Sequence, residues 1–127
     1  VPALAHQLSG EADELVVVPA DMPDLPGLVL AKLFKVLHRS DIAIASEHGG
    51  SGCAAIGVSL PLADWIPDDA FDLDQNPFTR LSAIAPRRGR CALTPTWHRL
   101  RTPADVGRLD PGLEGWEETR ALLASGR

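Results

Sequence analysis

Residues 16–26 read VVVPADMPDLP, and this stretch decides how the chain is expected to fold. The apolar run Leu15 to Val18, rich in β-branched residues, is typical of a strand that is buried on both faces of a sheet. A single carboxylate, Asp21, follows between prolines that restrict the backbone on either side. The pattern predicts a buried strand that ends on a charged side chain presented by a stiff loop.

Helical and extended patterns alternate along the chain. The helix expected over residues 27–38 is amphipathic, because apolar side chains recur there at positions i, i+3, i+4 and i+7. Further strands are expected at residues 41–45, 53–59 and 91–94, and further helices at residues 2–10, 78–85, from Thr102-Pro103 onward, and 114–124 with Trp116 and Leu123 on one face. The alternation predicts a single α/β domain over residues 1–127, a three-layer sandwich with a mixed, mostly parallel sheet.

Composition excludes several classes of protein. Of the 127 residues, 45% are apolar and 23% charged, as in an ordinary globular domain, and no run approaches the roughly 20 apolar residues of a membrane span. The net charge of −5 argues against a general nucleic-acid binder, and no secretory leader opens the chain, so we expect a cytoplasmic protein. Cys53 and Cys91 lack the spacing of a disulfide framework or zinc site, and we expect both to be small buried residues.

The charges are unevenly distributed. No acidic residue occurs from Gln75 to Ala104, where six arginines accumulate: Arg80, Arg87, Arg88, Arg90, Arg99 and Arg101. A cationic region within an acidic protein suits a small phosphorylated ligand. A solvated arginine face paired with the acidic stretch over residues 64–74 explains the same distribution, so both interpretations stay open.

Asp21 is the first candidate for a functional side chain. In open α/β sheets, ligands bind beyond the carboxyl ends of the strands, which is where Asp21 is expected. A carboxylate in that position can hold Mg²⁺, which proteins usually bind through one or two carboxylates together with substrate phosphates. A carboxylate that caps a turn or the following helix gives the same sequence, so the residues alone leave both roles open.

A glycine-rich loop follows the next expected strand and should lie on the same rim. Its residues Gly49, Gly50, Ser51 and Gly52 expose backbone N–H groups that can bind an anion or a sugar hydroxyl, although such a run also forms a simple tight turn. His48 and His98 are the histidines nearest to these loops. Serine–histidine catalysis would need an orienting carboxylate that the sequence does not place.

The order of these motifs resembles a known superfamily. A strand ending in Asp21 before a proline, the Gly49–Gly52 loop and Thr102-Pro103-Ala104-Asp105-Val106 resemble the nucleotide-diphospho-sugar transferases, which have a GT-A-type, Rossmann-like fold. Residues 12–125 are similar to the corresponding parts of 2-phospholactate guanylyltransferases, molybdenum-cofactor nucleotidyltransferases and small bacterial GT-A-like glycosyltransferases. The resemblance implies that Asp21 is a catalytic residue that holds Mg²⁺ against nucleotide phosphates, and that the glycine loop contacts the acceptor.

The chain departs from this pattern in two places. The superfamily begins with a glycine-rich nucleotide-binding segment that would precede Val1, so the chain resembles the C-terminal part of such a protein. The superfamily also carries acidic residues directly before Thr-Pro, where this sequence has Arg99 and Arg101. Arginine cannot coordinate a cation, so these two side chains would instead bind the phosphate groups of the substrate.

The resulting prediction is a Mg²⁺-dependent nucleotidyltransferase that acts on a small phosphorylated or otherwise anionic acceptor. The protein would accelerate the reaction by positioning the substrates and neutralising their charge. The other substrate would be a nucleotide or nucleotide-sugar. The alternatives are a GT-A-like glycosyltransferase and a non-catalytic α/β binding module that has lost the nucleotide loop. An exposed strand edge at Leu15–Val18 would let a partner chain, or a second copy of this chain, complete the sheet.

Overall fold

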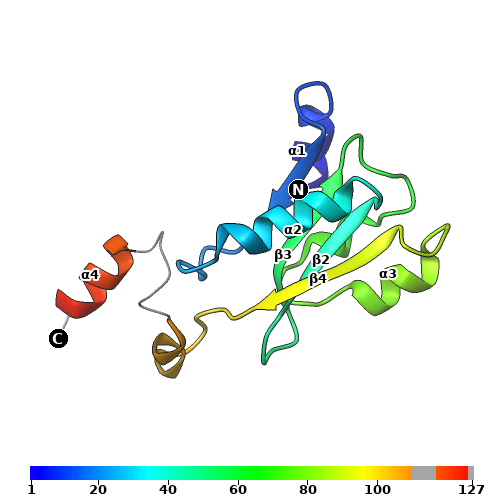
Figure 1. Ribbon diagram of the computed structural model, residues 1–127. Coiled ribbons are helices and arrows are strands. Elements are labelled where there is room, and N and C mark those ends of the chain that lie inside the picture. Colours follow the sequence, from blue (N-terminus) through cyan, green and yellow to red (C-terminus); the bar gives the residue numbers. More distant parts are fainter. Residues whose placement is uncertain (110–116, 126–127) are drawn as a thin grey trace.

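The computed structural model describes residues 1–109 and 117–125 (Figure 1). In these ranges helices and strands alternate as expected, except that no helix separates β2 from β3: α1 (Pro2–Leu8), β1 (Glu14–Val17), α2 (Gly27–Leu37), β2 (Ile42–Glu47), β3 (Cys53–Ser59), α3 (Phe78–Ile84), β4 (Cys91–Trp97) and α4 (Glu117–Ser125), with short 3₁₀ helices η1 (Asp68–Phe71) and η2 (Pro103–Arg108). The first three residues of the last expected helix, including Trp116, lie outside the described residues. No helix in the described ranges is long and apolar enough to cross a bilayer.

The four strands form one mixed sheet in the order β1-β3-β2-β4. The expectation of a mixed sheet is confirmed, but the expectation of a mostly parallel one is wrong. β3 pairs antiparallel with both β1 and β2, and only β2 and β4 pair in parallel. The reason is the short connection between β2 and β3, because residues 48–52 suffice for a hairpin and not for the longer crossover that parallel neighbours require.

β1 is an edge strand of the described sheet, as the alternative of an exposed edge at Leu15–Val18 predicts, and this corrects the expectation of burial on both faces. The apolar run at Leu15–Val18 predicts burial on both faces, yet all four residues of β1 are only partly buried and the side chain of Val18 is 45% exposed. β1 pairs with β3 alone, so one side of the strand has no neighbour within the described sheet. β4 forms the other edge, where Pro95 is tolerated because it need not donate to a further strand.

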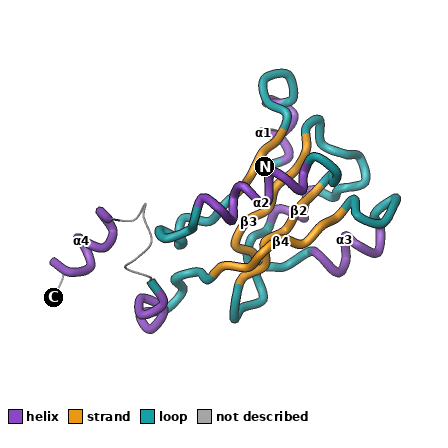
Figure 2. The backbone as a smooth tube through the Cα atoms, viewed as in Figure 1, coloured by secondary structure: helices purple, strands orange, loops and turns teal. Residues whose placement is uncertain are grey.

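Both faces of the sheet are covered, and β2 shows how. Its isoleucines Ile42 and Ile44 point to the face covered by η1 and α3, while Ala43 and Ala45 point to the face covered by α2. The small alanines let α2 lie close against β2 and β3, in front of the sheet in Figure 2. The buried centre of the sheet therefore fixes the positions of the loops at both ends of β2.

Candidate functional site

The segment after β4 brings the predicted site residues to one edge of the sheet. The Leu100 N–H donates to the backbone oxygen of Asp21 at 2.8 Å, and the His48 N–H donates to the backbone oxygen of Trp97 at 2.8 Å. These hydrogen bonds tie residues 97–100 to the loops that follow β1 and β2. Asp21, the glycine loop and the two arginines before Thr102 therefore meet at the carboxyl ends of β1, β2 and β4.

Arg99 binds Asp21 through a two-pronged ion pair. Its Nε donates to Oδ1 of Asp21 at 2.8 Å and its Nη2 to Oδ2 at 3.0 Å, so both carboxylate oxygens are engaged. Its Nη1 donates to the backbone oxygen of Leu73 at 3.0 Å and to Oδ1 of Asp74 at 3.2 Å. The hydrogen bond to Asp21 raises the pKa of the Arg99 guanidinium. The Arg99 side chain is 8% exposed and the Asp21 side chain 31%, so only the Arg99 side of this pair is shielded from water.

Arg101 forms the second half of the same network. Its Nε donates to the Glu47 carboxylate, and this hydrogen bond raises the pKa of Arg101. Its Nη1 lies 3.3 Å from Oδ1 of Asp74, so one aspartate bridges both arginines. Glu47 is buried, and a buried carboxylate is stable only when it is paired. We call Asp21, Glu47, Asp74, Arg99 and Arg101 the strand-end cluster.

A buried carboxylate lies next to this cluster. Asp24 has no exposed surface, accepts a hydrogen bond from Trp97 Nε1 at 3.3 Å, and its Oδ2 lies 2.9 Å from His98 Nε2. The His98 ring stacks on the Trp97 ring with 4.8 Å between centroids. Asp24 is therefore the orienting carboxylate that the sequence did not place. Within the described residues no hydrogen bond joins Ser51 to a histidine, so the arrangement is not a serine–histidine–aspartate triad.

The glycine loop packs closely against its surroundings. The Glu47 N–H donates to the Gly52 oxygen at 2.9 Å and closes the loop, and Gly49 adopts a φ of 77° that favours glycine. A Cβ at Gly50 would overlap the Glu47 carboxylate, and a Cβ at Gly52 would lie 2.6 Å from the Leu73 oxygen. Close packing therefore accounts for these glycines. Acceptor binding by the loop stays a prediction.

The residues around Asp21 do not fit a magnesium site. Both oxygens of Asp21 accept hydrogen bonds from Arg99, so the guanidinium stands where a metal ion would. In the part of the chain that the structure describes, no group of three or more histidine, cysteine, aspartate or glutamate side chains could hold a metal ion. Mg²⁺ requires oxygen ligands that are free to coordinate it, and a neighbouring cation opposes its binding.

The chain matches no family model, no curated protein and no solved structure. The resemblance to the nucleotidyltransferases therefore stays a prediction that rests on short motifs. Asp21, Arg99 and Arg101 were predicted as site residues, but the pairing of Glu47 with Arg101 was not. The contacts of Asp74 with both arginines fit the interpretation that the arginines pair with the acidic stretch over residues 64–74.

Proposed function

We propose that this chain is a non-catalytic α/β module that binds an anionic ligand without Mg²⁺, and that the strand-end cluster is a structural ion-pair network. The observation that supports this proposal is the two-pronged pair between Arg99 and Asp21, at 2.8 and 3.0 Å. The guanidinium supplies the positive charge that a metal ion would supply at the same carboxylate. Arg99 also satisfies the backbone oxygen of Leu73, which ties residues 73–74 to the site.

Electrostatics favour the guanidinium over a divalent cation. A unit charge and a divalent charge 4 Å apart repel by about 8 kcal/mol at an effective dielectric constant of about 20. Mg²⁺ could therefore bind Asp21 only after Arg99 had moved away. Such a movement would also remove the partner that Arg99 provides for Asp74 and weaken the neutralisation of buried Glu47, 3.9 Å from Arg99 Nε.

The same contacts argue against phosphate binding by Arg99 and Arg101. Their Nε donors are engaged by carboxylates, and both guanidiniums lie against Asp74. The cluster contains three carboxylates and two guanidiniums, a formal charge of −1, and would repel an anionic ligand. We infer that the ligand binds at another part of the surface.

A test of the metal-free role uses Mn²⁺ as a paramagnetic substitute for Mg²⁺. In ¹H–¹⁵N correlation spectra of the full chain, we expect no selective broadening of residues 20–24 or 97–101 by Mn²⁺ at up to about 1 mM, since Arg99 already engages both oxygens of Asp21. Arg99→Asp serves as the positive control, because it places a second carboxylate beside Asp21. Selective broadening in the wild-type chain that disappears in Asp21→Asn would overturn the proposal.

Nucleotidyl transfer is the second candidate. The observation that favours it is the meeting of Asp21, the Gly49–Gly52 loop and Thr102-Pro103 at one edge of a mixed sheet. The order of these elements, with helices over both faces of the sheet, supports a three-layer GT-A-type fold. Calorimetry with GTP, CTP or a UDP-sugar and Mg²⁺ tests this role. Metal-dependent heat that Asp21→Ala abolishes would support it, and equal heats in both proteins would exclude Asp21 from metal binding.

A further inference from the structure

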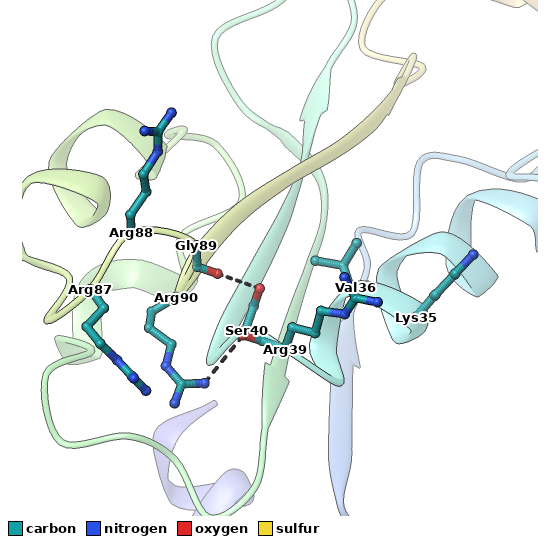
Figure 3. A pocket seen from close by; sticks show the side chains of 8 residues that line it. All are labelled: Lys35, Val36, Arg39, Ser40, Arg87, Arg88, Gly89 and Arg90. Carbon is teal, nitrogen blue, oxygen red and sulfur yellow. Dashed lines mark hydrogen bonds between the residues drawn. The ribbon is translucent and has the colours of Figure 1, made fainter.

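A second group of cationic side chains lies at the opposite end of β2 and β4 from the strand-end cluster. Residues directly before these two strands, together with the end of α2, line a cavity of about 760 Å³ (Figure 3). Five of the eight lining residues are cationic: Lys35, Arg39, Arg87, Arg88 and Arg90. We call these five the basic pocket. None of the eight is acidic, although the whole chain has a net charge of −5.

Four of these cations have no carboxylate partner among the described residues. Across residues 1–109 and 117–125, no ion pair reaches Lys35, Arg39, Arg87 or Arg88, and Arg90 alone faces an acid, Asp41, at 3.7 Å. At the strand-end cluster, by contrast, both arginines are fully paired. Unpaired cations that share one cavity repel one another, and a bound anion would remove that repulsion.

The backbone of the basic pocket is held in place. Ser40 is 4% exposed, and its hydroxyl donates to the Gly89 oxygen at 2.7 Å, joining the loop before β2 to the loop before β4. The N–H groups of Asp41 and Ile42 both donate to the Arg90 oxygen, at 2.9 and 3.2 Å. Gly89 has a φ of 87°, which allows the tight turn. The two loops that carry most of the cations are therefore positioned before any ligand arrives.

We propose that the basic pocket binds a small molecule that carries two or more linked phosphate groups, without a metal ion. Arginine forks match phosphate oxygens, and Figure 3 shows the cations spread around the pocket, with Arg88 and Lys35 pointing away from Arg87, so linked phosphate groups can reach more of them than a single phosphate. The volume lies within the roughly 300–1,000 Å³ of small-molecule sites. A long polyanion such as nucleic acid would also meet the acidic remainder of the surface. This inference rests on the binding role proposed above and assigns it a place.

Calorimetry with inorganic tripolyphosphate tests the assignment. The full chain in 150 mM NaCl with a chelator should bind one tripolyphosphate, at least about tenfold more tightly than orthophosphate, because more charge-assisted hydrogen bonds form. Arg39→Gln/Arg87→Gln should weaken binding by about tenfold or more. Both side chains are exposed, so the fold should persist, which an unchanged melting temperature would verify. Arg80→Gln is the matched control, since Arg80 is already paired with Asp69 and lies outside the pocket.

The outcomes separate this inference from the proposed function. Equal affinity in the wild type and in Arg39→Gln/Arg87→Gln, or tighter binding of an oligonucleotide or anionic vesicles than of tripolyphosphate, overturns the basic pocket as the site. In correlation spectra, tripolyphosphate should shift residues 35–40 and 87–91 and leave residues 97–101 unchanged. Mn²⁺ binding at Asp21 would overturn the metal-free role and leave these shifts in place, so the two failures are distinguishable.

Discussion

Replacing Arg99 with alanine should destabilise the protein strongly. The substitution removes four hydrogen bonds, of which two go to Asp21, one to Asp74 and one to the Leu73 oxygen. Removing one partner of a buried ion pair costs about 3–5 kcal/mol. The Asp21 side chain is 31% exposed and regains water, so the loss should be smaller, about 2–3 kcal/mol of unfolding free energy. For a domain of this size, the melting temperature should fall by roughly 6–12 °C.

A double-mutant cycle measures the part of this loss that belongs to the ion pair. Urea unfolding of Arg99→Ala, Asp21→Asn and the double variant should give a coupling free energy of about 1–2 kcal/mol. Arg99→Lys should recover less than half of the loss, because an ammonium group keeps the charge but cannot engage both carboxylate oxygens in one plane. Arg80→Ala, which breaks an exposed pair, should cost under about 0.5 kcal/mol.

Free-energy losses of the two single substitutions that add within about 0.3 kcal/mol would contradict a stabilising ion pair between Arg99 and Asp21. Additivity would mean that Arg99 stabilises the chain through the Leu73 oxygen or through packing, and that Asp21 is free to bind a cation. The metal-free role would then lose its main support.

Three further predictions concern other buried groups. Asp24→Ala should lower the unfolding free energy by about 3 kcal/mol in urea titrations, since it leaves His98 without its buried partner; a loss under 1 kcal/mol would contradict this. Gly52→Ala should be destabilising by at least about 1 kcal/mol, because its Cβ meets a backbone oxygen, whereas Gly10→Ala, with nothing within 4 Å, should not be. Burial raises the pKa of Cys53 from 9.0 to about 11, so its contribution to stability is complete below pH 9 and is lost as the pH rises towards 11. Between pH 9 and pH 11 the unfolding free energy of the wild type should therefore fall by up to about 2.7 kcal/mol more than that of Cys53→Ala. Parallel profiles of unfolding free energy against pH for the two proteins would contradict this.

The local spacing of apolar residues predicted most of the helices and strands, but not which strands lie next to each other in the sheet. The helix over residues 27–38 and the strands at 41–45 and 53–59 are confirmed within a few residues, because spacing and propensity act locally. The apolar run at Leu15–Val18 predicted burial on both faces, with an exposed edge there as an alternative, since sequence alone does not say how many strands flank a run. The antiparallel placement of β3 could have been predicted from the short connection before it.

The site was predicted in part for a similar reason. Asp21 was predicted because it directly follows a strand, and Arg99 and Arg101 because they directly precede Thr102-Pro103. Both are short-range features of the sequence. Their pairing was not found, because Arg99 reaches Asp21 across 78 positions of the sequence. The cations before β4 were recognised as unusual, but only the fold shows that Arg39 and Lys35 join them around one cavity.

The two ends of β2 carry opposite formal charges, −1 at the strand-end cluster and a group of cations at the basic pocket. With 6 residues, β2 separates the formally negative cluster from the cationic pocket by about 20 Å, which exceeds the screening length of about 8 Å at physiological ionic strength. Each end therefore presents its own charge to an approaching ion despite the net charge of the chain. The field of an approaching anion would exert a torque on the protein that turns the basic end towards the anion before contact. Added salt should accordingly slow the association of tripolyphosphate with the basic pocket much more than it speeds its dissociation.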